Sequence, residues 1–176
     1  MESLIEIGKA NTFPLVLEQV VTWWATVKSP HSSGDRAMLR RSRSPDEVAL
    51  QAAYYTLLES VLELDDTDMI RKLAPYRLPL IAGVLAHVKE DNSKCPIAKA
   101  MGMKKKGSDR PVISDLRFSR ILRTEDSAEL YITMIRVIKM LDYKVDVRDV
   151  ITSLFFWNEQ TRKRWASQYY LQKDMY

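Results

Sequence analysis

Residues 44–64, SPDEVALQAAYYTLLESVLEL, hold the clearest local structural signal in the sequence. Ser44 stands at an N-cap position, Pro45 at the first helical position, and Glu47 three residues after the cap, which is the pattern of a capping box. The pattern predicts a helix that begins here and continues to about Leu64. Five glycines among 176 residues disfavour a turn-rich β fold, so helices are expected throughout.

Further helices are expected on both sides of this stretch. Upstream, the sequence predicts a helix over 13–28, stopped by Pro30, and a short helix over 36–42. The apolar face of the first carries Leu17, Val20, Val21, Trp24 and Val27. Downstream, a short helix is expected to restart at 65–68 and to be interrupted at Pro75 and Pro79. A later apolar stripe is expected at Leu80, Val84, Leu85 and Val88. Additional helices are expected over 114–123, over 127–141, after an Asp146 cap and over 159–172.

Residues 91–113 interrupt the helical pattern. They contain Pro96, Gly102, Gly107 and Pro111 but few large apolar groups, which favours a mobile connection with at most one short helix. We therefore expect an all-α fold, a helical bundle in two packed parts joined by a basic, mobile connection. The expected division is an N-terminal part over 1–90, a linker over 91–113 and a C-terminal part over 114–176.

The charge is unevenly distributed along the chain. The net charge is +4, from 27 Lys and Arg against 23 Asp and Glu. Residues 94–123 nevertheless hold nine basic and two acidic residues, and residues 28–43 hold five basic and one acidic, whereas residues 44–93 hold four basic and nine acidic. Such a distribution is typical of a protein that binds a phosphate backbone with one surface and stays acidic elsewhere.

Two groups of arginines stand at helical spacing within the basic segments. Arg36, Arg40 and Arg43 fall within about 60° of one another on a helix, and residues 117, 120 and 123 form an i, i+3 ridge of arginines. We predict that the two groups converge on one surface. The candidate nucleic-acid-binding residues are Arg36, Arg40, Arg41, Arg43, Lys104, Lys105, Lys106, Arg110, Arg117, Arg120 and Arg123. A solvated helix face, or a flexible loop for residues 104–106, remains the competing interpretation.

The remaining chemistry-bearing residues argue for binding rather than catalysis. Aromatic residues at helical spacing among aliphatic ones are assigned to the core, so Trp157, Trp165 and Tyr169 are expected to be buried where the closing helices pack. One cysteine, Cys95, cannot form an internal disulfide, and together with two histidines it cannot complete a Cys/His zinc site. No phosphate-binding loop or catalytic motif is present, so we expect no enzyme activity, no cofactor and no metal. No apolar run reaches membrane-span length, which predicts a cytoplasmic protein.

Several short motifs, taken in order, resemble those of a known family. They are GDRAMLRR at 34–41, SP at 44–45, YYTL at 54–57, RFSRIL at 117–122, DV at 146–147, Trp157, and WASQYY at 165–170. Their order and spacing, in an all-helical frame, resemble the small subunit of the type I-E CRISPR Cascade complex, the CasB family. The resemblance covers residues 23–58 and 114–170, and residues 59–113 show no family pattern.

The resemblance implies a two-part helical subunit without catalytic activity. It implies two copies side by side in the complex, contacts with other Cascade subunits, and basic contacts to guide RNA, target DNA and displaced DNA. The implied role is to stabilise the R-loop formed by the guide RNA and its target. The alternative that remains open is a helical adaptor whose basic patch binds an acidic protein partner.

Overall fold

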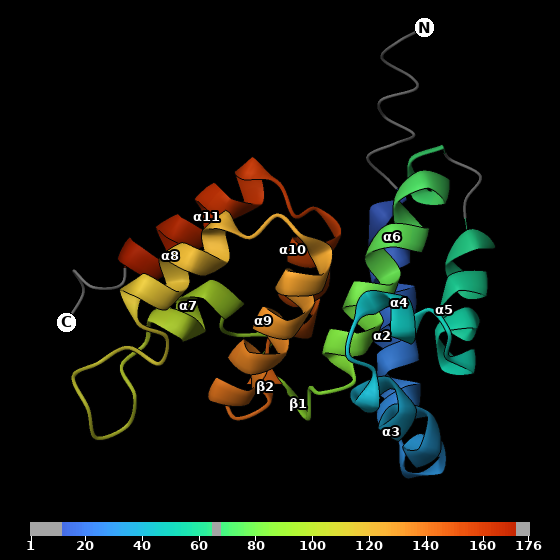
Figure 1. The fold of residues 1–176 in the computed structure, drawn as a ribbon, viewed down its shortest axis with the longest axis horizontal. Coiled ribbons are helices and arrows are strands. Elements are labelled where there is room, and N and C mark those ends of the chain that lie inside the picture. The colour runs from blue at the N-terminus through green and yellow to red at the C-terminus, as the bar shows by residue number, and fades with distance from the viewer. Residues whose placement is uncertain (1–11, 65–67, 172–176) are drawn as a thin grey trace, which may run out of the picture. The chain divides into compact units, whose positions relative to one another are not determined.

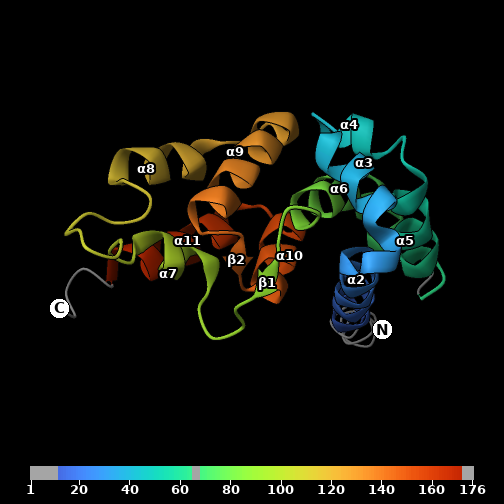
Figure 2. The ribbon, with the colours of Figure 1, turned by 90° about the horizontal axis from the view of Figure 1, so that it is seen from below.

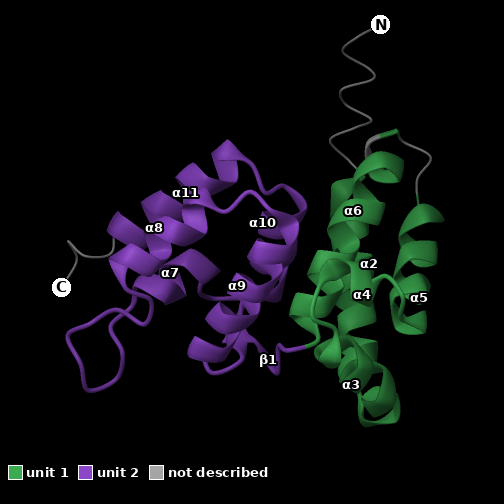
Figure 3. Ribbon diagram, viewed as in Figure 1, with its two compact units in different colours: residues 1–86 green, residues 87–176 purple. Residues whose placement is uncertain are grey.

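The fold is described from a computed structural model that covers residues 12–64 and 68–171 of the chain. The chain divides into two compact units, residues 1–86 and residues 87–176 (Figure 3). Within the described ranges almost all regular structure is helical, and the one sheet consists of two strands of two residues each. The all-α expectation is therefore confirmed. The helices in these ranges fall short of the length and apolar character needed to cross a membrane.

The first unit packs its helices around the long helix α6 (Figure 1). Its elements are α2 (Phe13–Lys28), η1 (Pro30–Ser32), α3 (Ser33–Arg41), α4 (Pro45–Val48), α5 (Ala52–Leu62) and α6 (Asp68–Leu85). Helices α3, α4 and α5 contact α6, and α2 contacts α3 and α5; Figure 2 shows α2 nearly end-on beside α5. The side chains of Trp23 and Trp24 are buried, and their indole N–H groups donate to the carbonyls of Ala53 and Leu85.

The predicted capping box at Ser44 is present, but the helix it opens is short. The Glu47 N–H donates to Ser44 Oγ at 3.2 Å, and Glu47 Oε2 accepts from the Arg43 N–H at 2.7 Å. Helix α4 ends at Val48, and Gln51 is extended before α5 begins, so the single helix predicted to Leu64 is wrong. In one continuous helix Val48 and Leu57 would point in opposite directions, whereas both are fully buried here.

The two prolines of α6 do not interrupt it. Pro75 and Pro79 both lie inside the helix, although each removes one backbone donor. The expectation that these prolines interrupt a short helix is wrong, because packing on α4 and α5 keeps residues 68–85 helical. The buried residues 80–86 include the predicted stripe residues Leu80, Val84 and Leu85. The predicted restart at residues 65–67 lies outside the described residues.

The second unit consists of five helices and two short strands among the described residues. Its elements are β1 (Glu90–Asp91), α7 (Ile97–Gly102), α8 (Asp115–Arg123), α9 (Ser127–Met140), β2 (Lys144–Val145), α10 (Val147–Phe155) and α11 (Glu159–Tyr170). The two short strands pair in parallel, and α7 and α8 both contact α11 (Figure 1). Trp165 and Tyr169 of α11 are fully buried and Trp157 is 7% exposed, so the predicted burial of these three aromatics is confirmed.

The division of the chain differs from the expected linker at 91–113. The boundary between the units lies at residues 86 and 87, and residues 87–113 are counted with the second unit. Ile97, Met101 and Ile113 are fully buried, and α7 packs on α11. These apolar residues are sparse in the sequence, but spacing of four residues places Ile97 and Met101 on one face of a short helix. Part of the expected linker therefore belongs to the core of the second unit.

Candidate nucleic-acid interface

Helix α8 has one buried apolar face and one exposed basic face. Phe118 and Ile121 are buried, whereas Arg117, Arg120 and Arg123 are exposed. The i, i+3 spacing of the arginines and the placement of the two apolar residues between them produce this separation on a nine-residue helix. The ridge predicted from the sequence is therefore a solvent-facing row of three guanidinium groups.

The start of α8 is held in place by the last helix. The ring of Phe118 stacks on that of Tyr169, with centroids 3.9 Å apart and 7° between the planes. The Tyr169 hydroxyl lies 2.7 Å from the Ile113 carbonyl oxygen and 2.9 Å from Asp115 Oδ1, and its one proton is donated to one of them. Burial, followed by the neighbouring Asp115 carboxylate, raises the pKa of Tyr169, so the hydroxyl stays a donor.

The end of α8 is fixed by the turn into α9. The Trp157 indole donates to the Thr124 carbonyl at 2.8 Å, and the Thr124 hydroxyl donates to the Arg120 carbonyl at 3.1 Å. Asp126 caps the start of α9, where its Oδ1 accepts from the Glu129 N–H at 2.8 Å. These hydrogen bonds hold the turn that joins α8 to α9.

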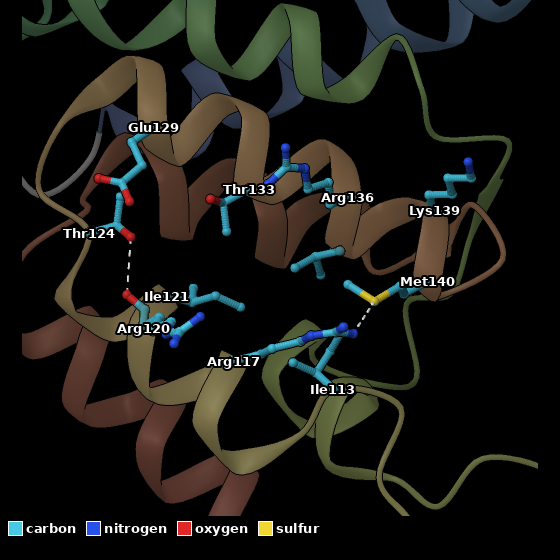
Figure 4. Close-up of a pocket in the computed structure, with 11 residues that line it drawn as sticks. Ile113, Arg117, Arg120, Ile121, Thr124, Glu129, Thr133, Arg136, Lys139 and Met140 are labelled. Carbon is cyan, nitrogen blue, oxygen red and sulfur yellow. Dashed lines mark hydrogen bonds between the residues drawn. The ribbon is translucent and has the colours of Figure 1, made fainter.

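A groove with a cavity volume of about 540 Å³ lies between α8 and α9 (Figure 4). We call it the α8–α9 groove. Its buried apolar lining includes Ile113, Ile121 and Val137. Its exposed lining includes four cationic side chains, Arg117 and Arg120 from α8 and Arg136 and Lys139 from α9. Figure 4 shows Glu129 at the end of the groove away from Lys139.

The four cations of the groove are not neutralised by carboxylates of the described chain. Among residues 12–64 and 68–171, none of them lies within 4.0 Å of an acidic side chain. Arg117 instead donates from Nη1 to the Met140 sulfur at 3.7 Å, a weak acceptor that leaves its charge uncompensated. The groove thus combines an apolar lining with four unneutralised cations and one acid, which is suited to a polyanion.

Arg136 and Lys139 were not among the candidates drawn from the sequence. They stand singly in an amphipathic helix, outside the basic segments 28–43 and 94–123. Their i, i+3 spacing repeats that of Arg117 and Arg120, and this spacing was the available signal. The two pairs face one groove only because of the tertiary arrangement of α8 and α9, so helix periodicity alone could not identify the second pair.

The remaining candidates of the second unit lie on a loop with its own backbone pairing. Met103 and Lys105 pair with Val112 and Arg110, since the Val112 N–H donates to the Met103 carbonyl and the Lys105 N–H to the Arg110 carbonyl, both at 2.9 Å. Gly107 supplies the left-handed backbone, with φ +77°, in the turn at its tip. The four candidates, Lys104, Lys105, Lys106 and Arg110, are exposed, and Lys104 Nζ lies 3.3 Å from Asp109 Oδ1.

The candidates of the first unit lie on or just after α3. Arg40, Arg41 and Arg43 are exposed, whereas Arg36 is half-buried and donates from Nε to the Ala86 carbonyl at 3.0 Å. Burial and the nearby Arg40 charge lower the pKa of Arg36. These residues and those of α8 belong to different units, so the convergence of the two groups stays a prediction.

Within the described ranges no three His, Cys, Asp or Glu side chains are grouped to hold a metal ion. The exposed aromatics Tyr55, Tyr76 and Tyr170 do not line the α8–α9 groove, so the geometry favours contacts to a backbone over stacking on bases.

Comparison with known proteins identifies the family to which this chain belongs. The model of a family described as CRISPR-associated protein Cse2 matches residues 35–170. Because the match spans more than half of the chain, the protein belongs to the Cse2 family of CRISPR-associated proteins. The resemblance found in the sequence is confirmed, and the match also includes residues 59–113, where no family pattern was recognised.

A solved structure shows the same fold. It is the crystal structure of E. coli Cascade bound to a PAM-containing double-stranded DNA target with a 32-nucleotide spacer. The chain covered in that structure is 14% identical, with a TM-score of 0.63, and the alignment covers 89% of this chain and 97% of that one. At this identity the likeness establishes the fold alone. No curated protein matches the chain.

Proposed function

We propose that this Cse2-family chain is a non-catalytic subunit of a type I-E CRISPR RNA-guided surveillance complex. In that role it binds nucleic-acid backbones and stabilises the R-loop of guide RNA and target DNA. Its partners are the other subunits of a Cascade complex, a second copy of itself, the guide RNA and the target and displaced DNA strands. Family membership and the fold shared with a chain of the E. coli Cascade crystal structure support the proposal.

One observation carries the nucleic-acid role, namely the four unneutralised cations of the α8–α9 groove. Arg117 and Arg120 are separated by about 4.5 Å along the helix axis, which lets two long side chains reach neighbouring phosphates of one strand. Arginine suits this task because its planar guanidinium can form two hydrogen bonds to one phosphate. The loop and α3 candidates described above are proposed as further backbone contacts.

The physical basis of R-loop stabilisation is a near-balanced exchange. Replacing a DNA duplex by an RNA–DNA heteroduplex changes the free energy little, so backbone contacts to the opened strands can decide the outcome. Guide pairing reads the sequence, and the protein therefore needs no groups that read base edges. Such a subunit needs positioned cations, which α8 and α9 provide.

The test is purification of the complex from the native host with wild-type chain or with Arg117→Glu and Arg120→Glu together. Both positions are exposed, so fold and assembly should be unaffected and guide RNA should copurify with either form. Retention of opened target DNA should fall for the double variant at equal subunit occupancy. If retention is unchanged and the variant instead loses an acidic protein, the adaptor function replaces this one.

A further inference from the structure

A second basic hollow lies in the first unit, at the corner where α2 passes through η1 into α3. Its cavity volume is about 320 Å³. Lys28 ends α2, Ser29 and Ser33 follow in the corner, and Arg36 and Arg40 come from successive turns of α3. Three cations and two hydroxyl groups thus line one small concave surface, and none of the described residues that line it is acidic.

Neighbouring contacts position two of the three cations. Arg36 donates from Nε to the Ala86 carbonyl, just beyond the end of α6. The Lys28 ammonium lies 4.9 Å from the centre of the Trp24 ring, and the Trp24 indole in turn donates to the Leu85 carbonyl at 3.1 Å. A bound anion would therefore meet side chains that have already lost part of their conformational freedom, which lowers the entropy cost of binding.

Electrostatics favour an anion in this hollow. Arg36 and Arg40 are four residues apart on α3, so their charges repel each other across one helical turn. A phosphate between them would replace this repulsion by two charge-assisted hydrogen-bonding contacts. Lys28 adds a third positive charge, and the serine hydroxyls can donate to further phosphate oxygens.

We propose that this hollow is a binding site for one phosphate group, held by Lys28, Arg36 and Arg40 with the hydroxyls of Ser29 and Ser33. Lys28 supplies the third cation, and it was not among the candidate binding residues predicted from the sequence. That the phosphate comes from a nucleic-acid backbone rests on the proposed function. The site extends that function, because it lets the first unit bind a single phosphate of a nucleic-acid strand. The same chemistry would accept free inorganic phosphate.

The experiment titrates the full-length chain, followed by amide NMR shifts, at constant ionic strength kept with chloride. The probes are inorganic phosphate and the dinucleotide TpT, which carries one phosphodiester. Lys28→Gln with Arg40→Gln removes two cations from the hollow and leaves the structural Arg36 contact intact. Arg71→Gln with Lys72→Gln is the matched control, since both residues are exposed on α6 of the same unit and lie outside the lining.

We expect phosphate to shift the amides of residues 28–37 and its affinity to fall about tenfold in the hollow variant, which corresponds to about 1.4 kcal/mol. The control variant should change affinity less than about twofold, or about 0.4 kcal/mol. Shifts by TpT at the same amides support the backbone source, and shifts by inorganic phosphate alone support a free-phosphate site. Equal losses in both variants, or no response beyond that to chloride, overturn the proposal. Failure here would leave the test at Arg117 and Arg120 unaffected, because that test concerns the other unit.

Discussion

Trp165 is the residue on which the packing of the last helix most depends. It is fully buried, its indole N–H donates to Ser153 Oγ at 3.0 Å, and its ring meets that of Trp157 edge-on at 4.9 Å. Trp165→Ala should therefore reduce the free energy of unfolding by about 3–5 kcal/mol through the cavity it leaves. Thermal and denaturant unfolding of the full chain measure this loss.

A control separates this structural role from surface effects. Tyr76 is 77% exposed on α6, so Tyr76→Ala should change the free energy of unfolding by no more than about 0.5 kcal/mol. Trp165→Ala with unchanged stability and lost nucleic-acid affinity would show that the tryptophan stacks on bases instead of packing in the core.

Asp146 makes stability depend on pH at the start of α10. Its side chain caps the helix by accepting from the Asp149 N–H at 2.9 Å, while burial chiefly, with the Asp149 and Asp91 charges, raises its pKa above the ordinary 3.8. The folded state then binds this proton more tightly than the unfolded state, so the contribution to stability is lost as the pH rises through the folded pKa. Asp146→Asn keeps a good cap without the charge and should raise the melting temperature at pH 7.

The pH profile of unfolding tests this expectation. The advantage of Asp146→Asn should shrink as the pH falls below about 4, where the wild-type carboxyl is protonated in both states. Asp149→Asn is the opposite control, since it weakens an ion pair in which Arg164 Nη2 lies 3.3 Å from Asp149 Oδ1, and it should lower the melting temperature at pH 7. A destabilised Asp146→Asn variant at neutral pH would contradict the explanation.

At the scale of elements, α9 should contribute to nucleic-acid binding as much as α8. Arg136 and Lys139 line the α8–α9 groove opposite Arg117 and Arg120. Arg136→Gln with Lys139→Gln should weaken retention of opened target DNA by about as much as Arg117→Gln with Arg120→Gln. Filter binding with the reconstituted complex provides the comparison.

The control for this comparison removes the same charge elsewhere in the second unit. Lys94 and Lys163 are exposed and line no part of the groove, so Lys94→Gln with Lys163→Gln should leave retention close to the wild-type value. If this pair weakens retention as much as the α9 pair, net charge rather than the groove determines binding, and the role of α9 is refuted.

The elements also show what the sequence could predict. Helix starts with a polar cap, such as Ser44 and Asp146, obey short-range rules and could be predicted from the sequence. The break after Val48 and the continuity through Pro79 depend on which partners each segment packs against, so tertiary packing overrides local preference. The charged pairs on α8 could be predicted, but their α9 partners required knowledge of which helices are neighbours.

On the scale of the whole molecule, the convergence of the α3 and α8 arginines is still to be tested. A photoreactive nucleotide placed at successive positions of the displaced DNA strand in the assembled complex would identify the peptides it reaches. We expect adjacent positions to crosslink both to the segment with Arg36 and Arg40 and to the segment with Arg117 and Arg120. Crosslinks to the two segments from well-separated positions would refute a single shared surface.

The central claim is that the α8–α9 groove holds a nucleic-acid strand by its phosphates, and the salt dependence of binding tests it most directly. DNA binding by the reconstituted complex is measured across a salt series, with wild-type chain and with the Arg117→Glu, Arg120→Glu variant at equal occupancy. Each lost contact to a single strand should make the slope of log affinity against log salt shallower by about 0.7, so the pair should change it by about 1.4. Equal affinities and equal slopes for the two complexes would contradict the claim.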